Sequence, residues 1–75
     1  MNKQNKTIIS VYLREKKVGY VQNVLTKKNK YILTPKYHDA KLYGSLQALL
    51  YDKALCYEIC NCGYTFEEEQ YHENY

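Results

Sequence analysis

The chain has no tryptophan, one proline, three glycines and one phenylalanine, and it contains no long apolar run. Its N-terminal stretch has no apolar segment long enough for a signal peptide or a membrane span, so we expect a cytoplasmic protein without membrane contact. The three cysteines are an odd number, and their spacing is not that of a disulfide framework. We therefore expect free thiols in a reducing compartment.

With 75 residues the chain predicts a single domain, 1–75, that leaves little room for a large internal cleft. We expect no cofactor and no enzymatic activity, because an active site with a bound cofactor needs such a cleft. The polar ends, residues 1–6 and 72–75, are expected to fray. The ten tyrosines combine an apolar ring with a polar tip, which suits surfaces that are buried only in a complex.

The net charge of +3 conceals two halves of opposite sign. Residues 1–36 contain nine Lys or Arg and one acid, Glu15, and carry +8, whereas residues 37–75 contain two Lys and seven acids and carry −5. One interpretation is that the two halves attract each other across a sheet. The other is that they form two functional faces that steer a charged partner.

Alternating apolar residues predict strands over 7–14, 17–26 and 31–34, with a turn at Glu15-Lys16 and a bulge at Gly19. A long helix over 45–62 follows, and residues from 64 onward form a last strand or an extended tail. The order β-β-β-α-β predicts an α+β fold, in which an antiparallel sheet of three to four strands has one face covered by the helix.

Local signals mark both ends of the helix. Ser45 is a suitable N-cap, and Gly63 stands where a left-handed residue ends a helix. An alternative is a shorter helix that ends near Leu55 and is followed by a strand over 56–61.

As a helix, residues 45–62 carry apolar residues on two opposite sides, and the sheet of so short a chain buries only one of them. The second side therefore predicts contact with another protein or with a second copy in a homodimer. We expect the exposed contact to be made by Tyr51, Leu55 and Ile59. The first side comprises Leu46, Leu49, Leu50, Cys56, Tyr57 and Cys60, and the second Ala48, Tyr51, Leu55, Ile59 and Cys62.

Three cysteines and a histidine have the residue types of a zinc site: Cys56, Cys60, Cys62 and His72. Zinc sites use paired short spacings, and the intervals here do not match them. Small thiols packed within the helix are the simpler interpretation. A zinc-stabilised binding module stays open as a second alternative, with these four residues as its ligand set.

The basic half offers a nucleic-acid alternative. Lysines contact phosphates, and exposed tyrosines stack on bases. Against it, the chain has a single Arg and an acidic C-terminal stretch, and lysines also protect edge strands from aggregation. The candidate residues are Lys16, Lys17, Lys27, Lys28 and Lys30, with Tyr20 and Tyr31.

The acidic stretch supports the opposite hypothesis. Glu67, Glu68 and Glu69 supply closely spaced carboxylates, which form either a solubilising tail or a mimic of nucleic acid that binds a basic target. We expect these three residues to contribute to protein binding together with the exposed helix side.

One stretch of the sequence resembles a pattern in small accessory proteins of phages and prophages. Tyr31-Ile32-Leu33-Thr34 is followed by Asp39-Ala40-Lys41-Leu42-Tyr43, then by Ser45 and the helix, although Pro35 replaces the acidic residue common after Leu-Thr. The likeness covers about residues 31–62. It implies a protein of the host cytosol that binds and alters a host or defence protein, and inhibitors of CRISPR effectors are one known outcome among such proteins.

Overall fold

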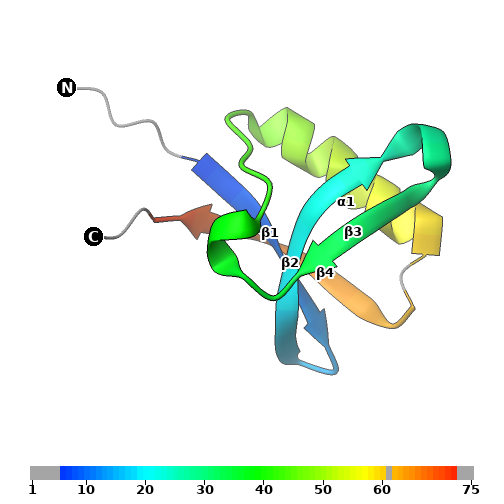
Figure 1. The fold of residues 1–75 in the computed structure, drawn as a ribbon, viewed down its shortest axis with the longest axis horizontal. Coiled ribbons are helices and arrows are strands. Elements are labelled where there is room, and N and C mark those ends of the chain that lie inside the picture. Colours follow the sequence, from blue (N-terminus) through cyan, green and yellow to red (C-terminus); the bar gives the residue numbers. More distant parts are fainter. Residues whose placement is uncertain (1–5, 61, 73–75) are drawn as a thin grey trace.

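The computed structural model describes residues 6–60 and 62–72, and it shows the predicted α+β architecture (Figure 1). Residues 1–5 and 73–75, expected to fray, lie outside the described residues; Lys6 opens the first strand instead of belonging to a frayed end. The elements are β1 (Lys6–Leu13), β2 (Lys16–Leu25), the 3₁₀ turn η1 (Thr26–Lys28), β3 (Lys30–Thr34), the 3₁₀ turn η2 (Tyr37–Asp39), α1 (Leu46–Cys60) and β4 (Tyr64–Tyr71).

The four strands form one antiparallel sheet in the order β3-β2-β1-β4. β1 and β2 are joined by Arg14 and Glu15, one residue earlier than the predicted turn, and both have positive φ values of 54° and 70°. Positive φ at both central residues gives a turn whose twist matches that of the adjoining strands. Such a turn usually contains Asn or Gly, because these residues tolerate positive φ best. Here two charged residues adopt it.

The bulge predicted at Gly19 is present. Val11 pairs with Gly19 and Tyr12 pairs with Lys17, so Val18 is the extra residue on β2. A Cβ atom at position 19 would lie 2.7 Å from the carbonyl oxygen of Thr34, which explains why glycine occupies this place.

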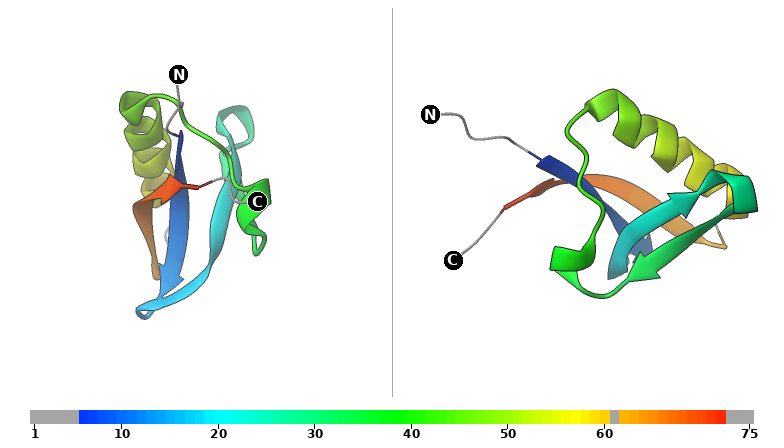
Figure 2. Two further views of the ribbon diagram at one scale, coloured as in Figure 1. Left: turned by 90° about the vertical axis from the view of Figure 1, so that its left-hand side faces the viewer. Right: turned by 45° about the horizontal axis from the view of Figure 1, so that its top comes forward.

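One face of the sheet packs against α1, and the connection between β3 and α1 reaches the other face (Figure 2). That connection is fixed by hydrogen bonds from Lys41 N–H to the Val21 carbonyl and between Thr7 and Tyr43 in both directions. The core between sheet and helix comprises Ile9, Val11, Val21, Tyr43, Leu49, Cys56 and Phe66.

The two helix ends behave largely as predicted. The Ser45 hydroxyl accepts a hydrogen bond from the Ala48 N–H at 3.3 Å, so Ser45 is the N-cap. The helix ends at Cys60, two residues earlier than predicted, and Cys62 and Gly63 both have positive φ, at 43° and 83°. Because α1 runs to Cys60, the alternative strand over 56–61 is excluded for the described residues.

Candidate interaction surface

The orientation of α1 is determined by a polar residue at the centre of its buried side. Asp52 is buried together with Leu49 and Cys56. Its carboxylate accepts a hydrogen bond from the Tyr43 hydroxyl at 2.6 Å and pairs with the Lys41 ammonium at 3.2 Å. Burial, and then the hydrogen bond to Asp52, raise the pKa of the Tyr43 phenol, so Tyr43 remains a donor.

This orientation leaves one flank of α1 open to solvent. Leu46 is 56% exposed, Leu50 is 42% exposed and Tyr57 is 38% exposed. At 3.6 residues per turn, these three side chains lie within about 40° of one another around the helix axis. They lie in one sector of α1, which we call the helix flank (Leu46, Leu50 and Tyr57), and Lys53 occupies the same sector between Leu50 and Tyr57.

The three helix residues predicted to make the exposed contact have different environments. Tyr51 is 64% exposed, in keeping with the prediction. Leu55 and Ile59 are half-buried rather than open. The helix is therefore turned so that part of its predicted outer side lies against the molecule, while Leu46, Leu50 and Tyr57 of its predicted inner side face solvent.

Tyr57 connects the helix flank to β4. Its hydroxyl accepts a hydrogen bond from the Phe66 N–H at 2.8 Å and lies 3.4 Å from the Phe66 carbonyl oxygen. The two rings meet edge-on with centroids 4.9 Å apart. Tyr57 is thus held in place although its outer surface is exposed, so it presents a preorganised aromatic ring to a partner.

The three glutamates of β4 alternate between the two faces of the sheet. Glu68 points to the helix side, where it pairs with Lys53 at 3.6 Å. Glu69 points to the other face, where it accepts hydrogen bonds from Ser10 and, at 2.8 Å, from Lys17. Glu67 is exposed, and within residues 6–60 and 62–72 its carboxylate has no ion-pair partner.

The ion pair between Lys17 and Glu69 should stabilise the fold at neutral pH and lose this effect in acid. Burial raises the pKa of Glu69, but hydrogen bonds from Lys17 and Ser10 outweigh it and hold that pKa below its ordinary value of 4.5. The stabilisation is therefore complete above pH 4.5 and is lost as the pH falls through the lower pKa of the folded state. In urea unfolding at neutral pH and at about pH 3, Glu69→Gln should lose less stability on acidification than the wild type. Equal losses would contradict the pairing.

The structure does not gather the candidate basic residues into one patch. Lys16 and Lys17 lie at the hairpin end of β2, whereas Lys27, Lys28 and Lys30 lie beyond its other end. Lys17 pairs with Glu69 and lies over the rings of Tyr12 and Tyr20, at 5.8 and 5.3 Å from their centroids.

The two candidate stacking tyrosines are engaged within the molecule. The Tyr31 hydroxyl donates to the Cys60 carbonyl oxygen, and its ring meets Phe66 edge-on at 5.5 Å. Tyr20 is half-buried and meets Tyr37 edge-on at 5.6 Å. Both rings therefore make contacts within the molecule instead of standing free on its surface.

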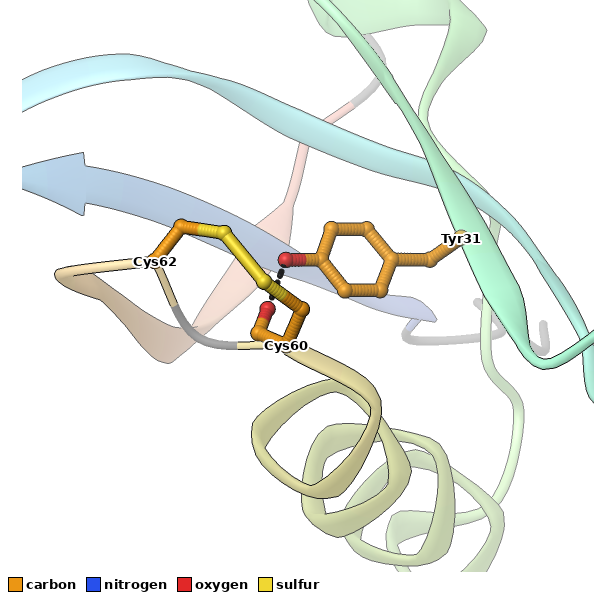
Figure 3. Close-up of a disulfide and its surroundings, with 3 residues drawn as sticks. All are labelled: Tyr31, Cys60 and Cys62. Carbon is orange, nitrogen blue, oxygen red and sulfur yellow. Dashed lines mark hydrogen bonds between the residues drawn. A yellow bond between two sulfur atoms is a disulfide. The ribbon is translucent and has the colours of Figure 1, made fainter.

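The expectation of three free thiols is wrong. Cys60 and Cys62 form a disulfide directly after α1, next to the Tyr31 hydroxyl (Figure 3). The two Cα atoms lie 5.5 Å apart, within the range of disulfide geometry. Cys56 is the free cysteine; it is buried, and burial raises the pKa of its thiol to about 11, with a further contribution from Asp52.

The candidate zinc ligands are separated. His72 follows the far end of β4, so the whole length of that strand lies between it and the disulfide. Among residues 6–60 and 62–72, no group of three or more His, Cys, Asp or Glu side chains is arranged to hold a metal ion.

Counting thiols tests this arrangement of cysteines. For protein purified without reductant, we expect no thiol to react with Ellman's reagent in the native state, because Cys56 is buried and protonated. One thiol should react in denaturant, and three after reduction. Three reactive thiols in denaturant without reductant would contradict the disulfide.

Sequence reasoning missed the burial of Asp52 and the exposure of the helix flank. A signal was available, since Asp52 is three residues after Leu49 and four before Cys56 and therefore shares their side of the helix. Identifying its partners, Tyr43 and Lys41, required the path of the connection before α1.

Comparison of this chain with sequence models of protein families, with characterised proteins and with solved structures finds no significant match. Within residues 6–60 and 62–72, no helix has both the length and the apolar character needed to cross a lipid bilayer.

Proposed function

We propose that this chain is a non-enzymatic protein-interaction module whose main contact is the helix flank. The observation that carries the proposal is the exposure of Leu46, Leu50 and Tyr57 along one side of α1. Large apolar side chains gathered on one element mark contact surfaces, whereas the same residues scattered singly over a surface are ordinary.

The free energy available from burying the helix flank shows that a partner must also make contacts outside it. Fully burying an aliphatic or aromatic side chain is worth about 1.5–3 kcal/mol, and the three flank residues are already about half-buried. Their remaining surface thus contributes roughly 2–4 kcal/mol, while a micromolar complex needs about 8 kcal/mol. The flank acts as an anchor, and a partner that reaches about 100° further around the helix axis from Leu50 also covers the exposed ring of Tyr51.

The partner we propose is a host or defence protein of the cytoplasm, bound and inhibited in the manner of a phage-type accessory protein. CRISPR effectors belong to this class of target. The carboxylates of Glu67 and Glu68 on β4 support a partner with a basic surface, because both are exposed. A homodimer formed through the helix flank is the second association we propose, and sedimentation equilibrium of the purified chain tests it.

A titration with nucleic acid distinguishes this proposal from the basic-hairpin alternative. We expect no binding of labelled DNA or RNA at low salt, because the lysines lie at opposite ends of β2 and both tyrosine rings are engaged. Fluorescence anisotropy measured over a range of salt concentrations provides the check. Binding that weakens steeply with salt would replace the proposed protein contact by a nucleic-acid contact.

A further inference from the structure

The outer edge of β4 has a backbone pattern that the helix flank does not explain. β4 is an edge strand, and its pairing with β1 runs without a register shift from Lys6 opposite Tyr71 to Leu13 opposite Tyr64. The Phe66 N–H donates to the Tyr57 hydroxyl and so points away from β1. In an unbroken antiparallel ladder alternate residues share this direction, so the backbone groups of Glu68 and Gln70 also point outward.

Tyrosine hydroxyls satisfy this edge at both ends but not in its middle. Tyr57 bonds Phe66, and the Tyr37 hydroxyl accepts a hydrogen bond from the His72 N–H at 2.8 Å. Between them, the outward N–H and C=O groups of Glu68 and Gln70 have no hydrogen-bond partner within residues 6–60 and 62–72. Two such residues in alternate positions offer four backbone hydrogen bonds to an added antiparallel strand.

The other edge of the sheet is protected in the usual ways. β3 has five residues, begins with Lys30 and is followed directly by Pro35. Short length, lysine and proline all discourage pairing with a further strand. The β3 edge is therefore less suited than the β4 edge to receive a further strand.

Charge selects the occupant of this edge. Glu67 and Glu69 lie on one face of β4 and Glu68 on the other, so an added strand meets carboxylates on both of its faces. A second copy of β4 would place glutamate against glutamate, which is destabilising. Lys53 and Lys17 neutralise Glu68 and Glu69 in part, at 3.6 and 2.8 Å, and leave Glu67 free of ion pairs with the described residues.

We propose that the outer edge of β4 at Glu68–Gln70 binds an extended lysine- or arginine-rich segment of the partner protein, which joins the sheet as an additional strand. The proposal rests on the function proposed above and supplies the chemistry of a second contact. Backbone hydrogen bonds provide the attachment, and the carboxylates, above all that of Glu67, select a basic sequence over an acidic one. Nucleic acid does not fit, because its phosphates would meet carboxylates.

A synthetic peptide tests the edge directly. The probe is an acetylated and amidated peptide of alternating lysine and valine, and its control carries the same charge with N-methyl groups on every backbone nitrogen, so that neither edge of the control can pair with β4. In NMR titrations, the first peptide should shift and protect the amides of Glu68 and Gln70, and the methylated peptide should not. Equal binding of both would show a purely ionic contact and overturn the proposal.

Two pairs of variants locate the contact. Gln70→Pro removes one outward N–H that β1 does not use, and it should weaken peptide binding about tenfold, whereas Gln70→Thr should not. If Gln70→Pro does not fold, a second pair of variants replaces it. Glu68→Lys should weaken peptide binding. Glu58→Lys makes the same charge change on the exposed side of α1 and should leave peptide binding unchanged. Equal effects within the pair that is used would contradict the proposal.

The peptide experiment fails separately from the proposed helix contact. The double variant Leu46→Glu/Leu50→Glu should bind the peptide like the wild type, because neither residue lies on β4. Loss of peptide binding with an intact helix contact would remove the edge site alone. If the peptide still binds but the double variant captures the partner protein as well as the wild type does, only the proposed helix contact is rejected.

Discussion

Replacing Asp52 with alanine is expected to lower the free energy of unfolding by about 2–3 kcal/mol, because it leaves the Tyr43 hydroxyl buried without an acceptor. Tyr43 is 4% exposed, so water does not substitute for the carboxylate. Lys41 contributes less to this loss, since its side chain is 39% exposed and its ion pair is screened by solvent. A chain of this length has a total stability of about 4–11 kcal/mol, so the variant should unfold at a clearly lower urea concentration.

A double-mutant cycle separates the hydrogen bond from the packing of Asp52. Tyr43→Phe removes the donor, and in the combined variant Tyr43→Phe/Asp52→Ala neither partner is left unsatisfied. We expect the combined loss to be smaller than the sum of the two single losses by about 1–2 kcal/mol. Additive losses in urea unfolding would mean that the 2.6 Å hydrogen bond does not stabilise the fold.

The second large effect is expected at the helix flank. Leu46→Glu/Leu50→Glu should weaken association with a partner or a second copy at least tenfold, because it places two charges in the proposed apolar contact. The fold should persist, since both side chains already face solvent and an acid in the first helical turn interacts favourably with the helix dipole. Urea unfolding measures the stability, and sedimentation equilibrium measures self-association.

Val18→Glu/Ile32→Glu is the matched control for this variant. Val18 is 42% exposed and Ile32 is 39% exposed, so the control removes similar apolar surface and adds the same charge on the sheet instead of the helix. The control should leave association unchanged. An equal loss of association in both double variants would point to net charge rather than to the helix flank.

The fold was predictable because its signals are local. Strand alternation, the bulge at Gly19, the N-cap at Ser45 and the left-handed Gly63 each depend on neighbouring residues. Helical periodicity likewise predicted one long helix. The hairpin turn shifted by one residue, since Arg14 and Glu15 are residues that rarely adopt positive φ, and the helix ended two residues early, at Cys60.

The candidate site was less predictable because it depends on distant contacts. Hydrophobicity assigned Leu46 and Leu50 to the inner side of the helix, but the partners of Asp52 come from the connection before α1 and turn the helix away from that arrangement. The length of β2 likewise separates Lys16 from Lys28, although both belong to the same basic half of the sequence.

Competitive affinity capture tests the helix flank as a contact surface most directly. Tagged chain is incubated with an extract of host cells and isotope-labelled untagged chain, and the captured proteins are quantified by mass spectrometry for the wild type and both double variants. We predict that at least one protein, a host protein or the labelled copy, is captured by the wild type and by Val18→Glu/Ile32→Glu but is lost with Leu46→Glu/Leu50→Glu. Capture of the same proteins in the same amounts by all three baits, or of none by any, would contradict the account.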